Sequence, residues 1–150
     1  MRIACLLPTL LLLAPSGPLA HAQAVARINH VAFFVAELQP SADFYRDVVG
    51  LEPIPEPFKD GRHAWFLIGP KTHLHIISGA EKRLPTEKRS HLCFTVPSVD
   101  EFRARLTARG IVYENLVGQK NSVTVRPDGV KQIYFQDPDG NWLEINDAKD

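Results

Sequence analysis

Three histidines and one glutamate occupy matching places in two similar parts of this chain. His30 is the second residue of NHVAFFV, and His91 is the second residue of SHLCFTV, 61 positions later. Near the ends of these parts, HLHII aligns with NWLEI, so that His75 matches Glu144. Imidazole nitrogens and carboxylate oxygens are ligands that Zn, Ni, Mn, Fe and Co accept. The pattern therefore indicates a shared site for a divalent metal ion.

The four side chains can meet only if strands present them on one face. Side chains alternate between the two faces of a strand, so a helix can cover the apolar face while the other face lines a trough. Unpaired imidazoles and a carboxylate in a partly dry trough would cost free energy, and a cation removes that cost. His73 shares the face of His75 and is the alternative ligand at that position.

The first half of the chain is expected to supply one helix and about four strands. A strand is expected over 28–36, and a helix opens at Pro40 and Ser41 and ends at Gly50. The proline-rich LEPIPEPF is an edge strand or irregular, because proline cannot donate to a ladder. HAWFLIG and KTHLHIIS are expected to be the next two strands.

The second half repeats this order after a polar linker over 79–90. A strand over 91–96 precedes a helix whose start has a capping box of Ser98 and Glu101. Short strands are expected over 111–114, 122–125, 131–136 and 142–146, and DPDGN is the turn between the last two. The sequence predicts an α+β fold of two paired βαβββ modules, about 27–79 and 89–147, which form a curved mixed sheet in one domain over 23–150.

The first 22 residues have the layout of a secretory signal peptide. A basic start at Arg2 precedes an apolar run over 3–14, and small residues surround a cut after Ala22. The protein is expected to be secreted or periplasmic, with no membrane attachment after cleavage; an uncleaved anchor is the alternative. Cys5 leaves with the signal peptide, so Cys93 has no disulfide partner and is expected to be a buried, inert thiol.

Composition limits the partners of the chain. Hydrophobic residues make up 45% of it and charged residues 23%, and the formal net charge is zero. These values fit one globular domain and give no electrostatic footprint for nucleic acid. A small-molecule substrate is the expected partner.

Most of the chain resembles the vicinal oxygen chelate superfamily, which includes glyoxalase I, methylmalonyl-CoA epimerase, fosfomycin- and bleomycin-resistance proteins and extradiol dioxygenases. The resemblance lies in INHVAFFV, AWFLIGPKTHLHII, SHLCFTVPSVDEFRARLTARGI and, most specifically, IYFQDPDGNWLEIND. It implies the two-module fold, the metal ligands His30, His75, His91 and Glu144, and a possible homodimer. His75 stands where many glyoxalase-like members have Glu or Gln, and members with three ligands lack it.

The resemblance also implies lyase or isomerase chemistry on a small substrate with vicinal oxygens, with Glu144 as the catalytic base. One alternative is a metal-free protein that binds and sequesters a drug. Another is an extradiol dioxygenase: Tyr134 stands ten residues before Glu144 as in that signature, but 125–127 lack its upstream histidine. Arg126, Tyr134 and Trp65 are weaker candidates for substrate contact.

Overall fold

The computed structural model describes residues 25–81 and 86–149, so the predicted signal peptide lies outside the described residues. The first module contains β1 (His30–Val35), α1 (Leu38–Phe44), a short π-helix η1 (Tyr45–Val49), β2 (Glu52–Ile54), β3 (His63–Gly69) and β4 (Thr72–Ser78). The second contains β5 (Leu92–Thr95), α2 (Val99–Ala108), β6 (Thr124–Val125), β7 (Lys131–Gln136) and β8 (Trp142–Asn146). None of the helices described is long and apolar enough to cross a membrane.

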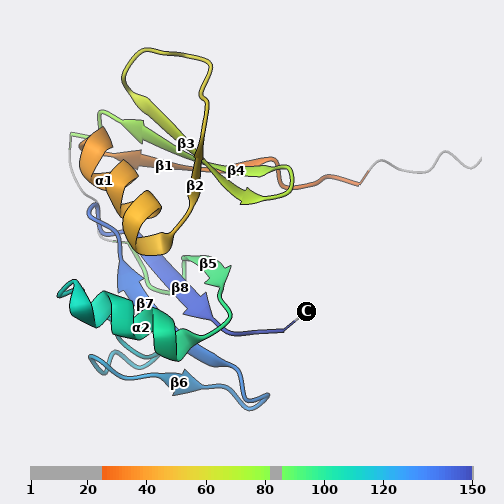
Figure 1. The fold of residues 1–150 in the computed structure, drawn as a ribbon, viewed down its shortest axis with the longest axis vertical. Helices are drawn as coiled ribbons and strands as arrows, with labels where there is room; N and C mark the ends of the chain where they lie inside the picture. Colours follow the sequence, from red (N-terminus) through yellow and green to blue (C-terminus); the bar gives the residue numbers. More distant parts are fainter. Residues whose placement is uncertain (1–24, 82–85, 150) are drawn as a thin grey trace, which may run out of the picture.

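The strands form two four-stranded mixed sheets, one from each module (Figure 1). Their orders are β1-β4-β3-β2 and β5-β8-β7-β6, so that the same permutation occurs twice. The first and last strands of each module pair in parallel, and the other neighbours are antiparallel. The predicted α+β class and the two βαβββ modules are confirmed. β1 and β5 are edge strands, and no ladder between the described strands joins the two sheets.

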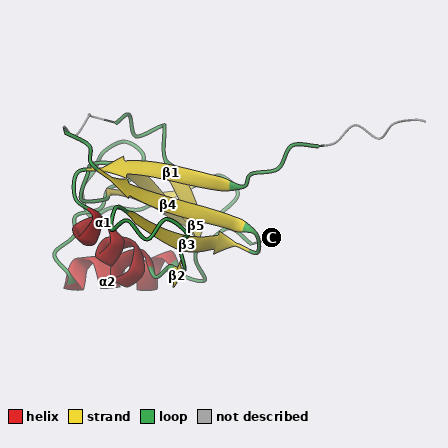
Figure 2. Cartoon of the chain, turned by 90° about the horizontal axis from the view of Figure 1, so that it is seen from above, coloured by secondary structure: helices red, strands yellow, loops and turns green. Residues whose placement is uncertain are grey.

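Each sheet buries one face beneath its own helix. In the first sheet, Val35, Leu74 and Ile76 are fully buried. In the second sheet, Ile133 and Leu143 are fully buried as well. Figure 2 shows both helices on one side of the strands, which leaves the opposite faces of the sheets free of helix. Because strand side chains alternate, these open faces carry the residues that the sequence singled out.

The helix boundaries follow local sequence signals. The Ser98 hydroxyl accepts from the backbone amide of Glu101 at 3.2 Å, which confirms the predicted cap of α2. Gly50 has a φ of +91° and ends η1, as expected for a residue that tolerates the left-handed region. The proline-rich segment supplies only the three-residue edge strand β2.

The turn between β7 and β8 also holds the two modules together. Asp139 accepts from the Ser41 hydroxyl at 2.7 Å and from the Ala36 amide at 2.8 Å. Asp137 accepts from the buried Tyr45 hydroxyl at 2.8 Å. Both carboxylates are buried, so these charge-assisted hydrogen bonds replace the water they lost on folding. The DPDGN segment is therefore an inter-module clasp as well as a turn.

One predicted strand is wrong. Residues 111–114 form no strand, and only Glu114 makes isolated bridges, to Lys120 and Tyr134. Two tight turns explain the difference, because Gly118 and Asn121 have φ values of +87° and +54°, which bend the chain back on itself. This segment is a loop beside the second sheet.

Candidate metal centre

The open face of the first sheet carries a column of parallel rings. β1, β4 and β3 are neighbours, and their register pairs Trp65 with His75. The register partner of His30 is His73, but the ring of His30 stacks against that of His75. The Trp65 and His75 rings are 3.9 Å apart with an interplanar angle of 4°, and the His75 and His30 rings are 4.4 Å apart at 8°. His73 lies on the same face, with its ring 6.1 Å from that of His75.

Two buried nitrogens in this column have no hydrogen-bond partner. They are His75 Nε2 and Trp65 Nε1, and they are the only such buried side-chain atoms among the described residues. Burial and the neighbouring His30, His73 and His63 lower the pKa of His75. A neutral imidazole has a lone pair on one of its two nitrogens, and in the tautomer with the proton on Nδ1 the unpartnered Nε2 can bind a cation. His75 is therefore chemically suited to the predicted role of metal ligand.

The second sheet brings His91 and Glu144 together. Their Nε2 and Oε2 atoms are 3.1 Å apart, and Glu144 is only 7% exposed. The other ring nitrogen of His91, Nδ1, lies 2.7 Å from the carbonyl oxygen of Lys88. A carbonyl only accepts, so Nδ1 carries the proton and Nε2 faces a carboxylate. The His91 Nε2 and the Glu144 carboxylate are therefore two donor groups directed at each other, as in a pair of ligands to one cation.

Hydrogen bonds hold Glu144 as a carboxylate. Burial alone would raise its pKa, but hydrogen bonds from Tyr134, Asn146 and Cys93 and the charge of His91 outweigh it, and the pKa is lowered. Asn146 Nδ2 donates to Oε1 at 3.1 Å. Burial and the contact with Glu144 raise the pKa of Tyr134, which remains a protonated donor. A carboxylate in this state is a ready metal ligand and a weaker general base.

Cys93 is not buried, contrary to the sequence prediction. It pairs in register with Glu144 and is exposed, because it lies on the open face and not beneath α2. Partial enclosure of the thiol and the Glu144 charge raise its pKa to about 12. The thiol therefore stays protonated at neutral pH, which agrees with the expectation of an unreactive cysteine.

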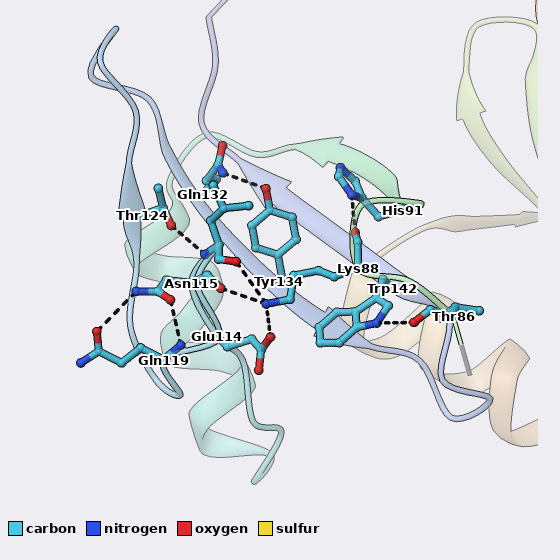
Figure 3. A network of polar contacts seen from close by, with 11 residues as sticks. Thr86, Lys88, His91, Glu114, Asn115, Gln119, Thr124, Gln132, Tyr134 and Trp142 are labelled. Carbon is cyan, nitrogen blue, oxygen red and sulfur yellow. Dashed lines mark hydrogen bonds and ion pairs between the residues drawn. The ribbon is translucent and has the colours of Figure 1, made fainter. Parts of the chain in front are cut away.

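Lys88 is a functional candidate that sequence reasoning missed. Its carbonyl orients His91, while its ammonium lies over the rings of Tyr134 and Trp142 and forms an ion pair with Glu114. Figure 3 shows this side chain between the two rings, with its end at Glu114. Its position three residues before His91 was the available signal, but it lay in a segment interpreted only as a linker.

The four predicted ligands form two pairs and not one cluster. The described residues contain no group of three or more His, Cys, Asp or Glu side chains placed to hold one ion. His30 lies with His75, and His91 lies with Glu144. The expectation that all four meet on one floor is not met within a single chain, because each pair belongs to its own sheet.

The three weaker candidates for substrate contact lie in different surroundings. Trp65 belongs to the ring column, and the Tyr134 hydroxyl accepts from Gln132 at 2.7 Å beside Glu144. Arg126 forms an ion pair with Asp128. A pocket of about 480 Å³ lies between the modules, and Val31, Phe33 and His91 are among the residues that line it.

Comparison with known proteins agrees with this architecture. The family model of the Glyoxalase/Bleomycin resistance protein/Dioxygenase superfamily matches residues 27–145. Metallothiol transferase FosB of Shouchella clausii is 30% identical over 122 residues, which cover 79% of this chain and 78% of that protein. The chain therefore belongs to the Glyoxalase/Bleomycin resistance protein/Dioxygenase superfamily.

Two solved structures extend the comparison. A putative glyoxalase family protein from Bacillus anthracis has a TM-score of 0.66 and 29% sequence identity. The match covers 84% of this chain and 98% of that protein. TnmS3, an antibiotic binding protein from Streptomyces sp. CB03234, has a TM-score of 0.60 and 25% sequence identity. The match covers 84% of this chain and 98% of TnmS3. The superfamily thus includes proteins named for catalysis and for binding.

Proposed function

We propose that this protein is a divalent-metal-dependent, glyoxalase-like lyase or isomerase that acts on a small substrate with vicinal oxygens. The observation that carries the proposal is the His91 imidazole, whose Nδ1 is fixed by a carbonyl while Nε2 faces the Glu144 carboxylate at 3.1 Å. The unpartnered Nε2 of His75 supports it. This nitrogen and oxygen donor set suits Zn, Ni, Mn, Fe or Co.

In this proposal, His30, His75, His91 and Glu144 hold the ion. A bound divalent ion would polarise the substrate oxygens and stabilise negative charge that develops on them. The Lys88 carbonyl keeps His91 in the tautomer that presents Nε2. Tyr134 and Asn146 donate to Glu144, and these contacts set its orientation. Glu144 is also the candidate that moves a proton next to the carbonyl of the substrate.

We infer that a second copy of the chain completes the site. The His30–His75 pair and the His91–Glu144 pair lie on the open faces of two different sheets, and the edge strands β1 and β5 are next to them. In a twofold-symmetric dimer, the first module of one chain can face the second module of the other, which gives two equivalent sites. The FosB relative and the glyoxalase-like neighbour support the enzymatic reading at the level of the superfamily.

Export is a separate part of the proposal. Residues 1–22 supply the basic start, apolar run and small residues of a signal peptide, so the mature protein begins at Gln23 in the periplasm or outside the cell. Intact mass of the protein recovered from the producing cell tests this directly. A mass that retains Met1 would contradict it.

A metal-free binding protein is the second candidate, and the similarity to TnmS3 favours it. The inter-module pocket of about 480 Å³ is large enough for part of a small organic molecule. A third possibility, ring cleavage by an extradiol dioxygenase, would be detected as oxygen consumption with a catechol.

Metal analysis of the purified wild-type protein separates the first two candidates. The enzyme proposal predicts binding of one divalent ion per chain, since a dimer has two sites, and conversion of a 2-oxoaldehyde adduct or a 2-substituted acyl thioester. The protein is titrated with Ni²⁺, Zn²⁺, Mn²⁺ and Co²⁺ after chelator treatment. No uptake of any of these ions would leave the sequestering function as the better account.

A further inference from the structure

The orientation of His91 depends on a segment without regular structure. Residues 86–91 belong to no helix or strand, and His91 Nδ1 lies 2.7 Å from the carbonyl oxygen of Lys88. Loops are more mobile than the strands they join, so the direction of the His91 ring depends on what holds residue 88 in place. A histidine ligand relies on such a partner at its second nitrogen to fix its tautomer and its ring.

The Lys88 side chain is anchored at its far end. Its ammonium forms an ion pair with Glu114 and donates to the carbonyls of Asn115 and Leu116 at 3.3 and 3.4 Å. The side chain is only 18% exposed, so water replaces few of these contacts if the ammonium leaves. A charge in such surroundings is costly to displace, because its partners would remain without it.

Two aromatic rings fix the path of the same side chain. The Lys88 nitrogen lies 5.7 Å from the ring centre of Tyr134 and 5.2 Å from that of Trp142, and Figure 3 shows it between them. Tyr134 is on β7, and Trp142 is on β8, the strand that carries Glu144. The carbonyl that orients His91 is therefore tied to the strand of its partner. Loss of the Glu114 carboxylate alone would leave both rings and both carbonyl contacts in place.

The other contacts of the segment act elsewhere. Thr86 is fixed to the second module, where its carbonyl accepts from Trp142 Nε1 at 3.1 Å. The Ser90 amide donates to the Glu87 carbonyl at 2.8 Å, which is a bond within the turn. Neither of these two contacts holds residue 88 against the second sheet. The Lys88 side chain does so.

We propose that the Lys88 side chain is a positioning residue for His91. By fixing residue 88 on the second sheet, it holds the carbonyl that keeps a proton on His91 Nδ1 and directs Nε2 at Glu144. The inference rests on the proposed function, in which His91 Nε2 binds the metal ion. It goes further, because it assigns the preorganisation of one ligand to a side chain outside the ligand set.

The test follows the Nδ1 proton of His91 in the full mature protein without metal, by NMR with ¹⁵N-labelled histidine. Its signal is assigned by its absence in His91→Ala. Lys88→Met keeps a long side chain between the two rings and removes the ammonium. We expect this proton to exchange with water at least about fivefold faster in Lys88→Met, because its hydrogen bond to residue 88 opens more often.

Metal binding gives the second readout. In calorimetric titration, Lys88→Met should bind Ni²⁺ about tenfold more weakly than wild type, as is typical when the partner of a ligand is disturbed. Lys88→Arg keeps a cation with several donors. It should bring both proton exchange and Ni²⁺ affinity back to within about threefold of wild type.

Lys131→Met is the matched control. Lys131 is another lysine of the second module with a carboxylate partner, but it pairs with Asp100 of α2, on the covered side of the sheet. Both readouts should stay within about twofold of wild type in this variant, because Lys131 contacts neither His91 nor residue 88.

Unchanged exchange of the His91 Nδ1 proton in Lys88→Met would overturn the inference. So would faster exchange with unchanged Ni²⁺ affinity, or an equal change in Lys131→Met, which would reflect a general loss of stability. If Lys88→Met does not fold, Lys88→Gln, which is shorter and uncharged, replaces it with the same expectation. Failure of wild type to bind Ni²⁺ would overturn the proposed function, whereas the Nδ1 proton, measured without metal, would still decide whether Lys88 positions His91.

Discussion

The two open sheet faces have the same topology but opposite chemistry. On the first face, Trp65, His75 and His30 form a stacked column in which two buried nitrogens lack partners. On the second, Glu144 receives several hydrogen bonds, and Tyr134 and Asn146 are themselves partnered. The two modules share one fold, but buried nitrogens lack hydrogen-bond partners on the first face, whereas the polar groups around Glu144 on the second face have them. The ion in the proposed function would supply the partner that the first face lacks.

The largest effect is expected on the second face. His91→Ala and Glu144→Ala each remove one member of the pair that lies 3.1 Å apart, and metal affinity should fall by about a hundredfold or more. Calorimetric titration with Ni²⁺ measures the loss. Glu114→Ala is the control, since this carboxylate pairs with Lys88 outside the predicted ligand set. Unchanged affinity in both site variants would show that the second face holds no metal.

The clasp between the modules should affect stability rather than binding chemistry. Asp139→Ala leaves the Ser41 hydroxyl and the Ala36 amide without their acceptor, and should lower the free energy of unfolding by about 2 kcal/mol. Urea denaturation measures this change. Asp128→Ala alters an exposed carboxylate and should stay within about 0.5 kcal/mol. If the two variants were equally stable, the clasp would be of no energetic consequence.

The first face should show a smaller effect on metal binding. His75→Ala removes one nitrogen ligand and one ring of the column, and Ni²⁺ affinity should fall by about tenfold. His73→Ala is the matched control on the same strand and face. If His73→Ala caused the larger loss, the ligand assignment would move to His73.

The smallest effect concerns alkaline pH. Burial and the nearby Asp137 raise the pKa of Tyr45, whereas an unfolded tyrosine loses its proton near pH 10. The stability from this buried phenol is therefore present below about pH 10 and is lost as pH rises. Tyr45→Phe should reduce the alkaline slope by up to about 1.4 kcal/mol per pH unit. Urea denaturation between pH 9 and 11 compares the slopes, and identical slopes would contradict the assignment.

The elements that were predicted correctly have a strong local signal, either alternating apolar and polar residues or a helix cap. β7 and β8 have the predicted bounds, and Ser98 caps α2, because these features depend on nearby residues. The segment 111–114 was predicted wrongly, because its apolar residues resemble a strand while the turns at Gly118 and Asn121 decide its path. Cys93 was predicted to be buried because its strand is apolar, but the open face decided its exposure.

The internal repeat predicted which candidate ligands share a strand face, but not which pairs would meet. His30 stacks on His75, and His91 contacts Glu144, because the first and last strands of each module lie next to each other. The relation between the modules depends on long-range contacts such as those of Asp139 with Ser41, which no local pattern indicates. The position of Trp65 likewise depends on the β3–β4 register, which sets its ring against that of His75.

Complementation between two inactive variants tests the central claim most directly. One variant carries His30→Ala and His75→Ala, the other His91→Ala and Glu144→Ala, and neither should bind Ni²⁺ tightly. When the two are mixed, unfolded and refolded together, half of the dimers should be mixed and should contain one intact site. Tight binding should then return to about a quarter of the wild-type level. Absence of any recovery, with dimers present, would contradict a site built from the two faces of different chains.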